Sequence, residues 1–532
     1  MKTLITGGLV YDGTGAPPLQ ADVLFEDGKI LEIGRIPPEA ADTLLAAEKK
    51  AVTPGFIDSH RHADLAALAD PDFGEAELAQ GITTCLTGNC GLAPFPSRPQ
   101  TFPEVLDFIE PCLGSAPPGL QPGSFADYLK QLQGKSWPLN IGGLAATGAV
   151  KAAVKGYGKS PFTRQEMADA QQMLKEALLS GAFGLSAGIM YTPECYSSKE
   201  EFIRLLAPAA PFARPLCCHI RGEGDSLVAS VQEAISLADE AGLPLNISHF
   251  KSVGCRNWRE QIFRAIEKIE AARSRGQDVT VDFYPYTGGS TTLLTLIPPS
   301  LTGSTTGETL RALDAPDGAE RLKKDLLRDW PGWDNMVDSI GWERVIISSV
   351  ARQENKPLQG RDVAEICQKS GEDEAAFICR LLVEEQGKVG VVLMSMDQAD
   401  VDTVARLPYS MVISDSLYGA PDCPHPRLFG SFGRIFRDMV RERGILCFEE
   451  ALHKMTGMTA ERFGLKGRGF LRPGYVADIN IFSPEAFGDR GDYSHPRQLC
   501  QGMEMVFVGG RMVWNSRGRT GKNSGTVLLA AQ

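Results

Sequence analysis

Four of the seven histidines in the 532-residue chain stand where strands are expected to end. His60 and His62 close one apolar segment, and side chains two apart on a strand face the same side, so both imidazoles can reach one metal ion. His219 and His249 each end a further strand, one strand–helix unit apart, and Asp415 ends the last one. Imidazoles together with a carboxylate form hydrolytic metal sites of the zinc type.

A single histidine at a strand end is usually an ordinary hydrogen-bonded polar residue. The joint order of a His-x-His pair, two single histidines and a final Asp is much harder to obtain by chance, and it indicates a metal hydrolase. His453, within an expected helix, and His495, near the C-terminus, are interpreted as structural. For His425 both interpretations stay open.

These side chains can meet only if the strands that end in them share one barrel. Strands and helices alternate regularly along the chain, which is typical of a parallel sheet. Helices are expected from Thr163, where Glu166 completes a capping box, and over 226–241 and 257–275. The carboxyl ends of barrel strands meet on one face, where barrel active sites lie. The eight expected strands lie near residues 57, 85, 142, 185, 217, 247, 281 and 412.

Both chain ends consist of short β elements. Strands are expected over 3–11 and 21–33, with a hairpin signal at Asp27-Gly28, and a C-terminal hairpin turns at Gly509-Gly510. We therefore predict a small β domain from residues 1–54 and 466–532 and a barrel over 55–465. Two surplus strand candidates, 344–350 and 389–395, are assigned to an insertion at about 291–390.

The overall composition is that of a folded, acidic protein. Hydrophobic residues make up 43% and charged residues 23%, which excludes disordered and fibrous classes. A net charge of −12 argues against non-specific binding to nucleic acid or to anionic membranes. No apolar run approaches the ~18 residues of a membrane span, and the N-terminus lacks a signal-peptide pattern. The twelve cysteines form no disulfide framework, so we predict a cytoplasmic protein.

The order and the amino-acid sequences of these segments resemble those of the amidohydrolase superfamily and, within it, the N-acyl-D-amino-acid deacylases (D-aminoacylases), over nearly the whole chain. The resemblance implies a distorted (β/α)8 TIM-type barrel with a small β-sandwich domain built from both chain ends. It also implies hydrolysis of the amide bond of N-acyl-D-amino acids. The motifs concerned are Pro54–His62, Gly81–Thr84, Gly88–Gly91, Gly184–Tyr191, His219–Asp225, Ile247–Lys251, Asn257-Trp258, Tyr284–Ser290 and His425–Arg427.

The Gly88-Asn-Cys-Gly91 element discriminates best within the superfamily. The subgroup is known for a Cys after the second strand, where most members bridge two metals with a carboxylated Lys or a Glu. A free Cys is usually a small buried hydrophobe, as we expect for Cys85, but a metal-bound thiol is soft and deprotonated, which suits zinc. By resemblance, the tight Zn²⁺ ligands are Cys90, His219 and His249, and a second, weaker position is framed by His60, His62 and Asp415.

The resemblance also assigns substrate contacts: Lys251, Tyr284 and Ser290 to the α-carboxylate and Tyr191 to the pocket. Same-face spacing places Lys251 and Arg221 near the metal, because each lies two residues past a candidate ligand. We therefore predict Arg221 as a further substrate contact. A local ion pair with Glu223 or Asp225 is the alternative for both cations.

Asp415 is the expected general base and acid. The resemblance places the stretch 291–298 at the side-chain pocket, and it contains no Lys or Arg. An unpaired carboxylate buried against an apolar wall costs several kcal/mol. We therefore predict a preference for neutral or hydrophobic D-residues over D-Glu and D-Asp.

Two other functions fit parts of the pattern. A cyclic-amide hydrolase of the dihydroorotase or hydantoinase type shares the fold but needs a bridging Lys, for which Lys151 is the only candidate; Cys90 and Tyr284-Pro-Tyr286 argue against it. A non-catalytic scaffold would lack ligands, and none is missing. Relatives commonly carry a Gly-His-Gly-type turn after the third strand, whereas 143–151 here has no His. Beyond a small-molecule substrate the sequence indicates no partner and gives no oligomeric state.

Overall fold

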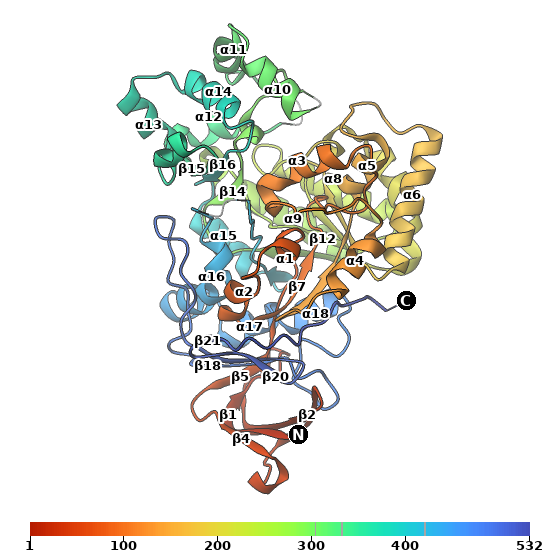
Figure 1. Ribbon diagram of the computed structural model, residues 1–532, viewed down its shortest axis with the longest axis vertical. Helices are drawn as coiled ribbons and strands as arrows, with labels where there is room; N and C mark the ends of the chain where they lie inside the picture. The colour runs from red at the N-terminus through yellow and green to blue at the C-terminus, as the bar shows by residue number, and fades with distance from the viewer. Residues whose placement is uncertain (304, 331–332, 420–421, 532) are drawn as a thin grey trace.

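The computed structural model describes residues 1–303, 305–330, 333–419 and 422–531, which form three parts. Figure 1 shows a barrel of strands and helices, a β layer below it, and a smaller lobe at the upper left. This is the α/β architecture with a second, smaller β part that the sequence predicts.

The barrel consists of eight strand positions in two parallel sheets. The third position is split at Leu144. The N–H of Leu144 donates to Thr87 O, at the end of the second position, and the N–H of Ala145 donates to Gly184 O, just before the fourth; both distances are 2.9 Å. A parallel bridge between Arg61 and Ser416 closes the circle. One sheet runs β6 (Phe56–Asp58), β7 (Ile82–Thr87), β8 (Asn140–Gly143); the other runs β9 (Ala145–Ala146), β10 (Leu185–Gly188), β11 (Leu216–His219), β12 (Leu245–Ile247), β13 (Val279–Phe283), β17 (Ser410–Val412). The split confirms a distorted (β/α)8 barrel.

Two of the three expected helices have the predicted ends, and one does not. The hydroxyl of Thr163 accepts from Glu166 N–H and starts α6 (Arg164–Leu179), and Gly242, at φ 67°, ends α8 (Leu227–Ala241). The third, α9 (Gln261–Ser274), begins four residues later than expected. Residues 255–257 form a 3-10 turn instead, and Arg259 has a left-handed φ of 60° that interrupts any helix there.

The other helices around the barrel are α1 (Ala66–Ala69), α2 (Glu75–Ala79), α3 (Phe102–Leu113), α4 (Phe125–Gln133), α5 (Thr147–Lys155), α7 (Lys199–Leu206), α15 (Gln398–Ala405), α16 (Arg427–Arg434), α17 (Phe448–Lys454) and α18 (Gly457–Arg462).

The β part joins both chain ends in one sheet with its own apolar core. Asp27 and Gly28, at φ 48° and 77°, form the predicted hairpin turn. β5 (Ala51–Pro54) and β18 (Ile479–Phe482) pair antiparallel and connect the N- and C-terminal halves. The strands are β1 (Thr3–Val10), β2 (Leu19–Glu26), β3 (Lys29–Gly34), β4 (Thr43–Ala46), β5 (Ala51–Pro54), β18 (Ile479–Phe482), β19 (Met503–Val508), β20 (Arg511–Asn515) and β21 (Gly518–Arg519).

The last residues of the chain return to the barrel, as the position of the C-terminus in Figure 1 also shows. Ile141 N–H donates to Thr526 O, Leu528 N–H donates to Ile141 O, and Ala530 N–H donates to Gly181 O, at 2.7–3.0 Å. Residues 526–530 therefore lie against the barrel, at Ile141 of β8 and at Gly181, rather than in the sheet of the β domain, to which we had assigned them. The remaining domain boundaries stay our proposal.

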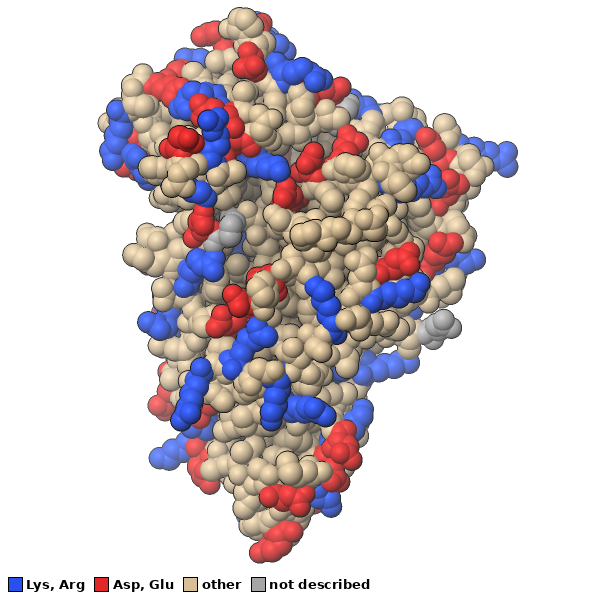
Figure 2. Space-filling model, viewed as in Figure 1, with Lys and Arg blue, Asp and Glu red and all other residues tan. Residues whose placement is uncertain are grey.

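The insertion is a separate lobe between the barrel positions β13 and β17. Its sheet, in the order β14 (Gly289–Thr292), β16 (Gly390–Leu393), β15 (Val345–Ser349), is antiparallel and includes both surplus strand candidates. It has its own buried core, and Figure 2 shows both signs of charge interspersed over its surface. Its helices are α10 (Thr306–Leu313), α11 (Gly318–Asp325), α12 (Met336–Ile340), α13 (Val363–Ser370) and α14 (Glu374–Glu384).

All twelve cysteines are unpaired thiols. Among the described residues, no helix combines the length and the apolar character that crossing a membrane requires. The cytoplasmic location stays a prediction.

Candidate metal centre and active site

All six predicted ligand side chains converge at the carboxyl ends of the barrel strands, and all are buried. Their donor atoms form three overlapping groups, within each of which the atoms lie within 4.8 Å of one another. The groups are His60, His62 and Cys90; Cys90, His219 and His249; and His60, His249 and Asp415.

The spacing of the donors fits a shared metal ion. Cys90 Sγ lies 3.2 Å from His60 Nε2 and 3.5 Å from His249 Nε2. Zinc–sulfur and zinc–nitrogen bond lengths place two such donors about 3.6 Å apart around a tetrahedral ion. Both ring nitrogens of His219 are buried without a hydrogen-bond partner, which costs roughly 1–3 kcal/mol for each unsatisfied group. A metal ion bound to this set would give His219 the partner that it lacks.

Three of these residues have a backbone conformation that non-glycine residues rarely adopt. Cys90, His249 and Asp415 have φ values of 54°, 36° and 50°. Such conformations cost roughly 1–3 kcal/mol each and cluster at functional sites. Each stands where the chain turns from a strand into a loop. Asp415 is fixed there by its N–H, which donates to His60 O at 2.9 Å.

Side chains alternate between the two sides of extended backbone, which places His60 and His62 on the same side. His60 and His62 each bring Nε2 to 3.4 Å from Asp415 Oδ1. Arg61 points to the other side, where its guanidinium is fully buried and pairs with Glu77 at 2.6 Å and with Asp58 at 3.1 Å. The pair thus faces the metal cluster as the spacing predicts.

Asp415 lies between the histidines and a buried cation. Its Oδ2 is 2.9 Å from Nη1 of Arg427, whose side chain is 2% exposed. Burial opposes ionisation of Asp415, but Arg427 and the neighbouring histidines outweigh it and keep the pKa of Asp415 well below its usual range. The carboxylate is therefore ionised at neutral pH.

The electrostatic environment favours the ligand forms of two histidines. Burial lowers the pKa values of His219 and His249 well below the usual range, so both are neutral, the form that binds metals. Burial also raises the pKa of the Cys90 thiol well above its usual value. A bound cation would reverse that preference, because a coordinating thiol is deprotonated.

Two buried carboxylates support the ligands. Glu223 was expected only as the ion-pair alternative for Lys251 and Arg221, and its pair with Lys251 is present; Asp282 was not predicted from the sequence. Glu223 Oε1 lies 3.0 Å from His249 Nδ1 and 2.6 Å from Lys251 Nζ. Asp282 Oδ1 lies 3.7 Å from His60 Nδ1 and accepts from His249 N–H. Carboxylates beside ligand imidazoles fix the orientation of the rings. The available signals were the spacing of Glu223, four residues after His219, and the acidic position of Asp282 inside an apolar strand.

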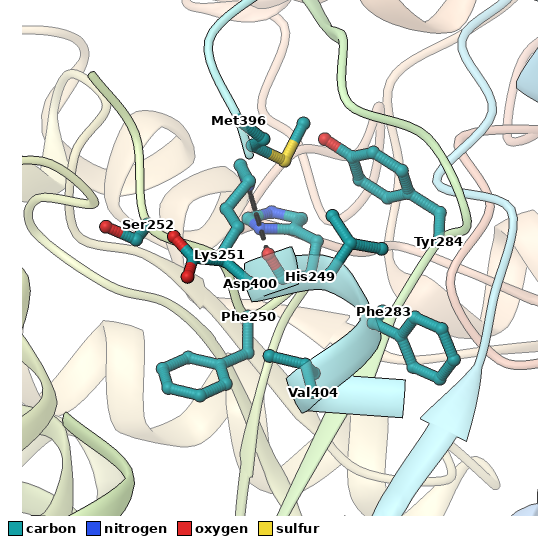
Figure 3. A pocket seen from close by; sticks show the side chains of 10 residues that line it. His249, Phe250, Lys251, Ser252, Phe283, Tyr284, Met396, Asp400 and Val404 are labelled. Carbon is teal, nitrogen blue, oxygen red and sulfur yellow. Dashed lines mark hydrogen bonds between the residues drawn. The ribbon is translucent and has the colours of Figure 1, made fainter. Parts of the chain in front are cut away.

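Lys251 and Tyr284 line one cavity next to the metal cluster, together with Met396. Figure 3 shows Lys251 hydrogen-bonded to His249 on one side of this cavity and Tyr284 on the other. The Tyr284 ring has Arg427 at 4.8 Å and Lys251 at 5.8 Å from its centroid. Two cations therefore converge on the Tyr284 side chain. Ser290 follows on β14, and its contact with the substrate stays a prediction.

Tyr191 lies on the opposite side of the metal cluster. Its ring centroid is 4.6 Å from that of His219. The Tyr191 side chain is half-buried and lines a second cavity together with Cys90.

Arg221 does not join the cluster. Its guanidinium binds the Glu233 carboxylate at 2.9 Å and the carbonyl oxygens of Cys195 and Ser197. The ion-pair alternative therefore describes Arg221 better than the predicted substrate contact, and its partner is Glu233 rather than Glu223 or Asp225.

Three further residues take structural contacts. Lys151 pairs with Glu201 at 2.8 Å, which removes the candidate for a bridging lysine. His425 Nε2 lies 2.9 Å from Gly288 O, and its Nδ1 accepts from Arg427 N–H. His453 contacts Gly13 O at 2.8 Å.

Comparisons with known proteins agree with this geometry. The model of the amidohydrolase family matches residues 411–514. A D-aminoacylase from Alcaligenes xylosoxydans xylosoxydans is 32% identical over 533 residues, 99% of this chain and 97% of the relative. An N-acyl-D-aspartate deacylase of the same organism is also 32% identical, over 99% and 94% of the two chains.

A solved structure has the same fold over its full length. It is that of the N-acyl-D-glutamate deacylase of Bordetella bronchiseptica, complexed with zinc and a phosphonate inhibitor that mimics the tetrahedral intermediate. It has a TM-score of 0.82, 28% sequence identity and 99% coverage of both chains. This protein is thus a hydrolase of linear amide bonds, and the chain belongs to the N-acyl-D-amino-acid deacylase (D-aminoacylase) family of the amidohydrolases.

Proposed function

We propose that the protein hydrolyses N-acyl-D-amino acids with neutral side chains in a zinc-dependent reaction. The observation that carries the proposal is the joint arrangement of six buried donors with two cations and the Tyr284 side chain beside them. The donors fit a Lewis-acidic ion, and the cations fit the carboxylate of an amino acid.

Cys90, His219 and His249 would hold the tight zinc ion, and His60, His62 and Asp415 would frame a weaker second position. A zinc ion held there would polarise a carbonyl group and lower the pKa of a bound water molecule towards ~7. Glu223 orients the imidazole of His249, and Asp282 holds the His249 backbone by accepting from its N–H.

Asp415 moves the proton in this proposal. Its Oδ1 faces the histidine pair and Oδ2 is fixed by Arg427, so Oδ1 is the oxygen that can take the proton from an attacking water. The same oxygen then returns that proton to the nitrogen of the leaving amine as the C–N bond breaks. The Tyr191 hydroxyl lies on the side where the oxyanion develops and can donate to it.

Lys251, Tyr284, Ser290 and Arg427 bind the α-carboxylate. A charge-assisted hydrogen bond from a cation is roughly twice as strong as a neutral one. Arg427 is a partner that we did not assign in the sequence; stacked on Tyr284, it presents its planar group from the opposite side to Lys251.

A screen of N-acyl-D- against N-acyl-L-amino acids, with metal analysis of the same sample, tests the proposed function. We expect turnover of the D series alone and about one tightly bound zinc per chain. Turnover of the L series, or full activity in a zinc-free sample, would contradict it.

N-acetyl-D-leucine is expected to be a better substrate than N-acetyl-D-glutamate. In this proposal Lys251 and Arg427 are engaged by the α-carboxylate, and Arg221 is paired with Glu233. A second substrate carboxylate would therefore be buried without a free partner, which costs several kcal/mol. The measurement is kcat/KM for both compounds side by side; a clear preference for the glutamate would overturn this view of the pocket and leave the deacylase assignment intact.

Lys251→Ala is expected to raise KM roughly tenfold or more, with a smaller loss of kcat, because the lost charge-assisted bond acts in ground and transition states alike. On substrates whose carboxylate is esterified, the variant and the wild type should then perform equally. An unchanged penalty on the esters would show that Lys251 is not the carboxylate anchor.

Glu223→Gln is expected to weaken zinc binding about 10–100-fold, as the loss of an orienting carboxylate typically does. Competition with a chelator measures this directly. Glu233→Gln is the matched control, since Glu233 pairs with Arg221 outside the metal cluster. Equal zinc affinity in both variants would show that Glu223 does not orient the ligand.

A further inference from the structure

A small apolar cavity lies beside Cys90, on the side of the barrel mouth where the proposed reaction assigns Tyr191 to the oxyanion and leaves the acyl chain without a contact. The loop after β7, helix α3, the start of α5 and the loop after β10 form its walls. Helices α3 and α5 pack against each other, and both lie in the upper part of the barrel in Figure 1. Its apolar lining includes Leu92, Ala93, Val105, Phe108, Ile109 and Tyr191.

The order of strands places this cavity opposite the carboxylate anchors. Around the barrel, its walls follow β7, β9 and β10, the second to fourth positions, whereas Lys251 and Tyr284 follow β12 and β13, the sixth and seventh. In a barrel of eight strands these positions face each other across the mouth. Cys90, which lines the cavity, and His249, which lines the other one, belong to the same donor group between them.

The covalent structure of the substrate determines which of its groups lies on the Cys90 side of the metal donors. In an N-acyl-amino acid, the carbonyl carbon separates the acyl chain from the nitrogen and the α-carbon. When the carboxylate lies on Lys251 and Tyr284 and the carbonyl group lies at the metal donors, the acyl chain points away from the anchors. We propose that the cavity beside Cys90 is the acyl subsite and that it selects short, uncharged acyl groups; this inference rests on the proposed function.

The size and polarity of the cavity support this selection. Its free space is about that of one water molecule, which is close to the volume of a methyl group. The one carboxylate in its wall, Glu194, is buried and accepts from Gly188 N–H at 2.8 Å. An acyl group that ends in a second carboxylate would lose its hydration against apolar walls, and the lining offers no Lys or Arg to pair with it.

Phe108 sets the length limit. It is the largest side chain that α3 contributes to the lining, and its ring packs on Tyr157 at a centroid distance of 4.9 Å. Because Phe108 is only half-buried, its truncation opens the cavity without removing a central part of the core. In a closed apolar pocket, one methylene group changes kcat/KM by roughly 10–200-fold.

The test compares N-acetyl-, N-butyryl-, N-hexanoyl- and N-succinyl-D-leucine with the zinc-loaded enzyme. For the wild type we expect kcat/KM to fall at least tenfold from acetyl to butyryl and further for hexanoyl and succinyl. Phe108→Ala should reduce the difference between acetyl and butyryl to about threefold or less. Phe263→Ala on α9, where Phe263 is 48% exposed and outside both cavities, should keep the wild-type profile.

The outcomes separate the two proposals. A wild type that accepts the long chains equally well, or a folded Phe108→Ala protein with an unchanged profile, overturns the acyl subsite and leaves the deacylase intact. If Phe108→Ala does not fold, Phe108→Leu is measured instead, and it must shift the profile in the same direction. No turnover of any of the four compounds overturns both proposals.

Discussion

Replacing Cys90 with Ala is expected to remove most of the bound zinc and nearly all activity. Cys90 belongs to two of the three donor groups, and its Sγ lies within 3.5 Å of both His60 and His249. Without it, His219 and His249 remain as the only tight ligands, too few for a stable tetrahedral site. After dialysis we expect about a tenth of the wild-type zinc content or less, measured by elemental analysis alongside kcat.

Cys85→Ala is the matched control for this experiment. Cys85 lies five residues earlier, on β7, and is fully buried in the barrel core rather than in a donor group. Its truncation should lower stability by about 1–2 kcal/mol, as small core deletions do, and leave the zinc content unchanged. Full zinc and full activity in the Cys90 variant would contradict the ligand assignment, and loss of zinc in both variants would point to folding.

The barrel and five of the six converging donors could be predicted because that information is local, whereas Cys90 was assigned by resemblance to the family. An apolar segment that ends in His or Asp specifies both a strand and the residue at its carboxyl end. The parallel barrel then brings those ends together without knowledge of any long-range contact. The capping box at Thr163 and the turn at Asp27-Gly28 are equally local, and the structure has both.

The partners of the charged residues could not be predicted in the same way. Arg221 binds Glu233, which is on the following helix, and Arg427 binds Asp415 across a loop. The number of residues between a cation and a candidate ligand indicates on which side of the strand the cation points. It does not indicate which carboxylate the cation pairs with. Lys251 and Arg221 have the same spacing and different environments, because only Lys251 has Glu223 within reach.

The side-chain pocket shows the same limit. We expected the stretch 291–298 to form its apolar wall, but Leu293, Leu296 and Ile297 are buried in the insertion's own core. An apolar residue indicates burial but does not say in which hydrophobic core it is buried. In a chain with several cores, the sequence alone does not assign the residue to one of them. The preference for neutral side chains therefore depends on the partners of the cations around the site.

Asp415→Asn is expected to lower kcat at least ~10²-fold, because an amide cannot take up the proton of the attacking water. Most of the tightly bound zinc should remain, since Cys90, His219 and His249 are unchanged. The variant should also be less stable. Arg427, 1% exposed, loses the carboxylate that neutralises it, and breaking a buried ion pair costs up to about 3–5 kcal/mol.

A control must therefore separate this loss of stability from the loss of the base. Asp489→Asn removes another buried carboxylate, one that pairs with Arg437 at 2.6 Å and belongs to no donor group. We expect it to lower the melting temperature in the same way and to keep kcat within about twofold, since no group that contacts substrate changes. Both variants are assayed well below their melting temperatures, with zinc analysis of each sample. Near-normal turnover of Asp415→Asn would show that another residue transfers the proton. An equal loss of kcat in both variants would attribute the effect to folding, because the two substitutions are the same and differ only in the position of the lost carboxylate.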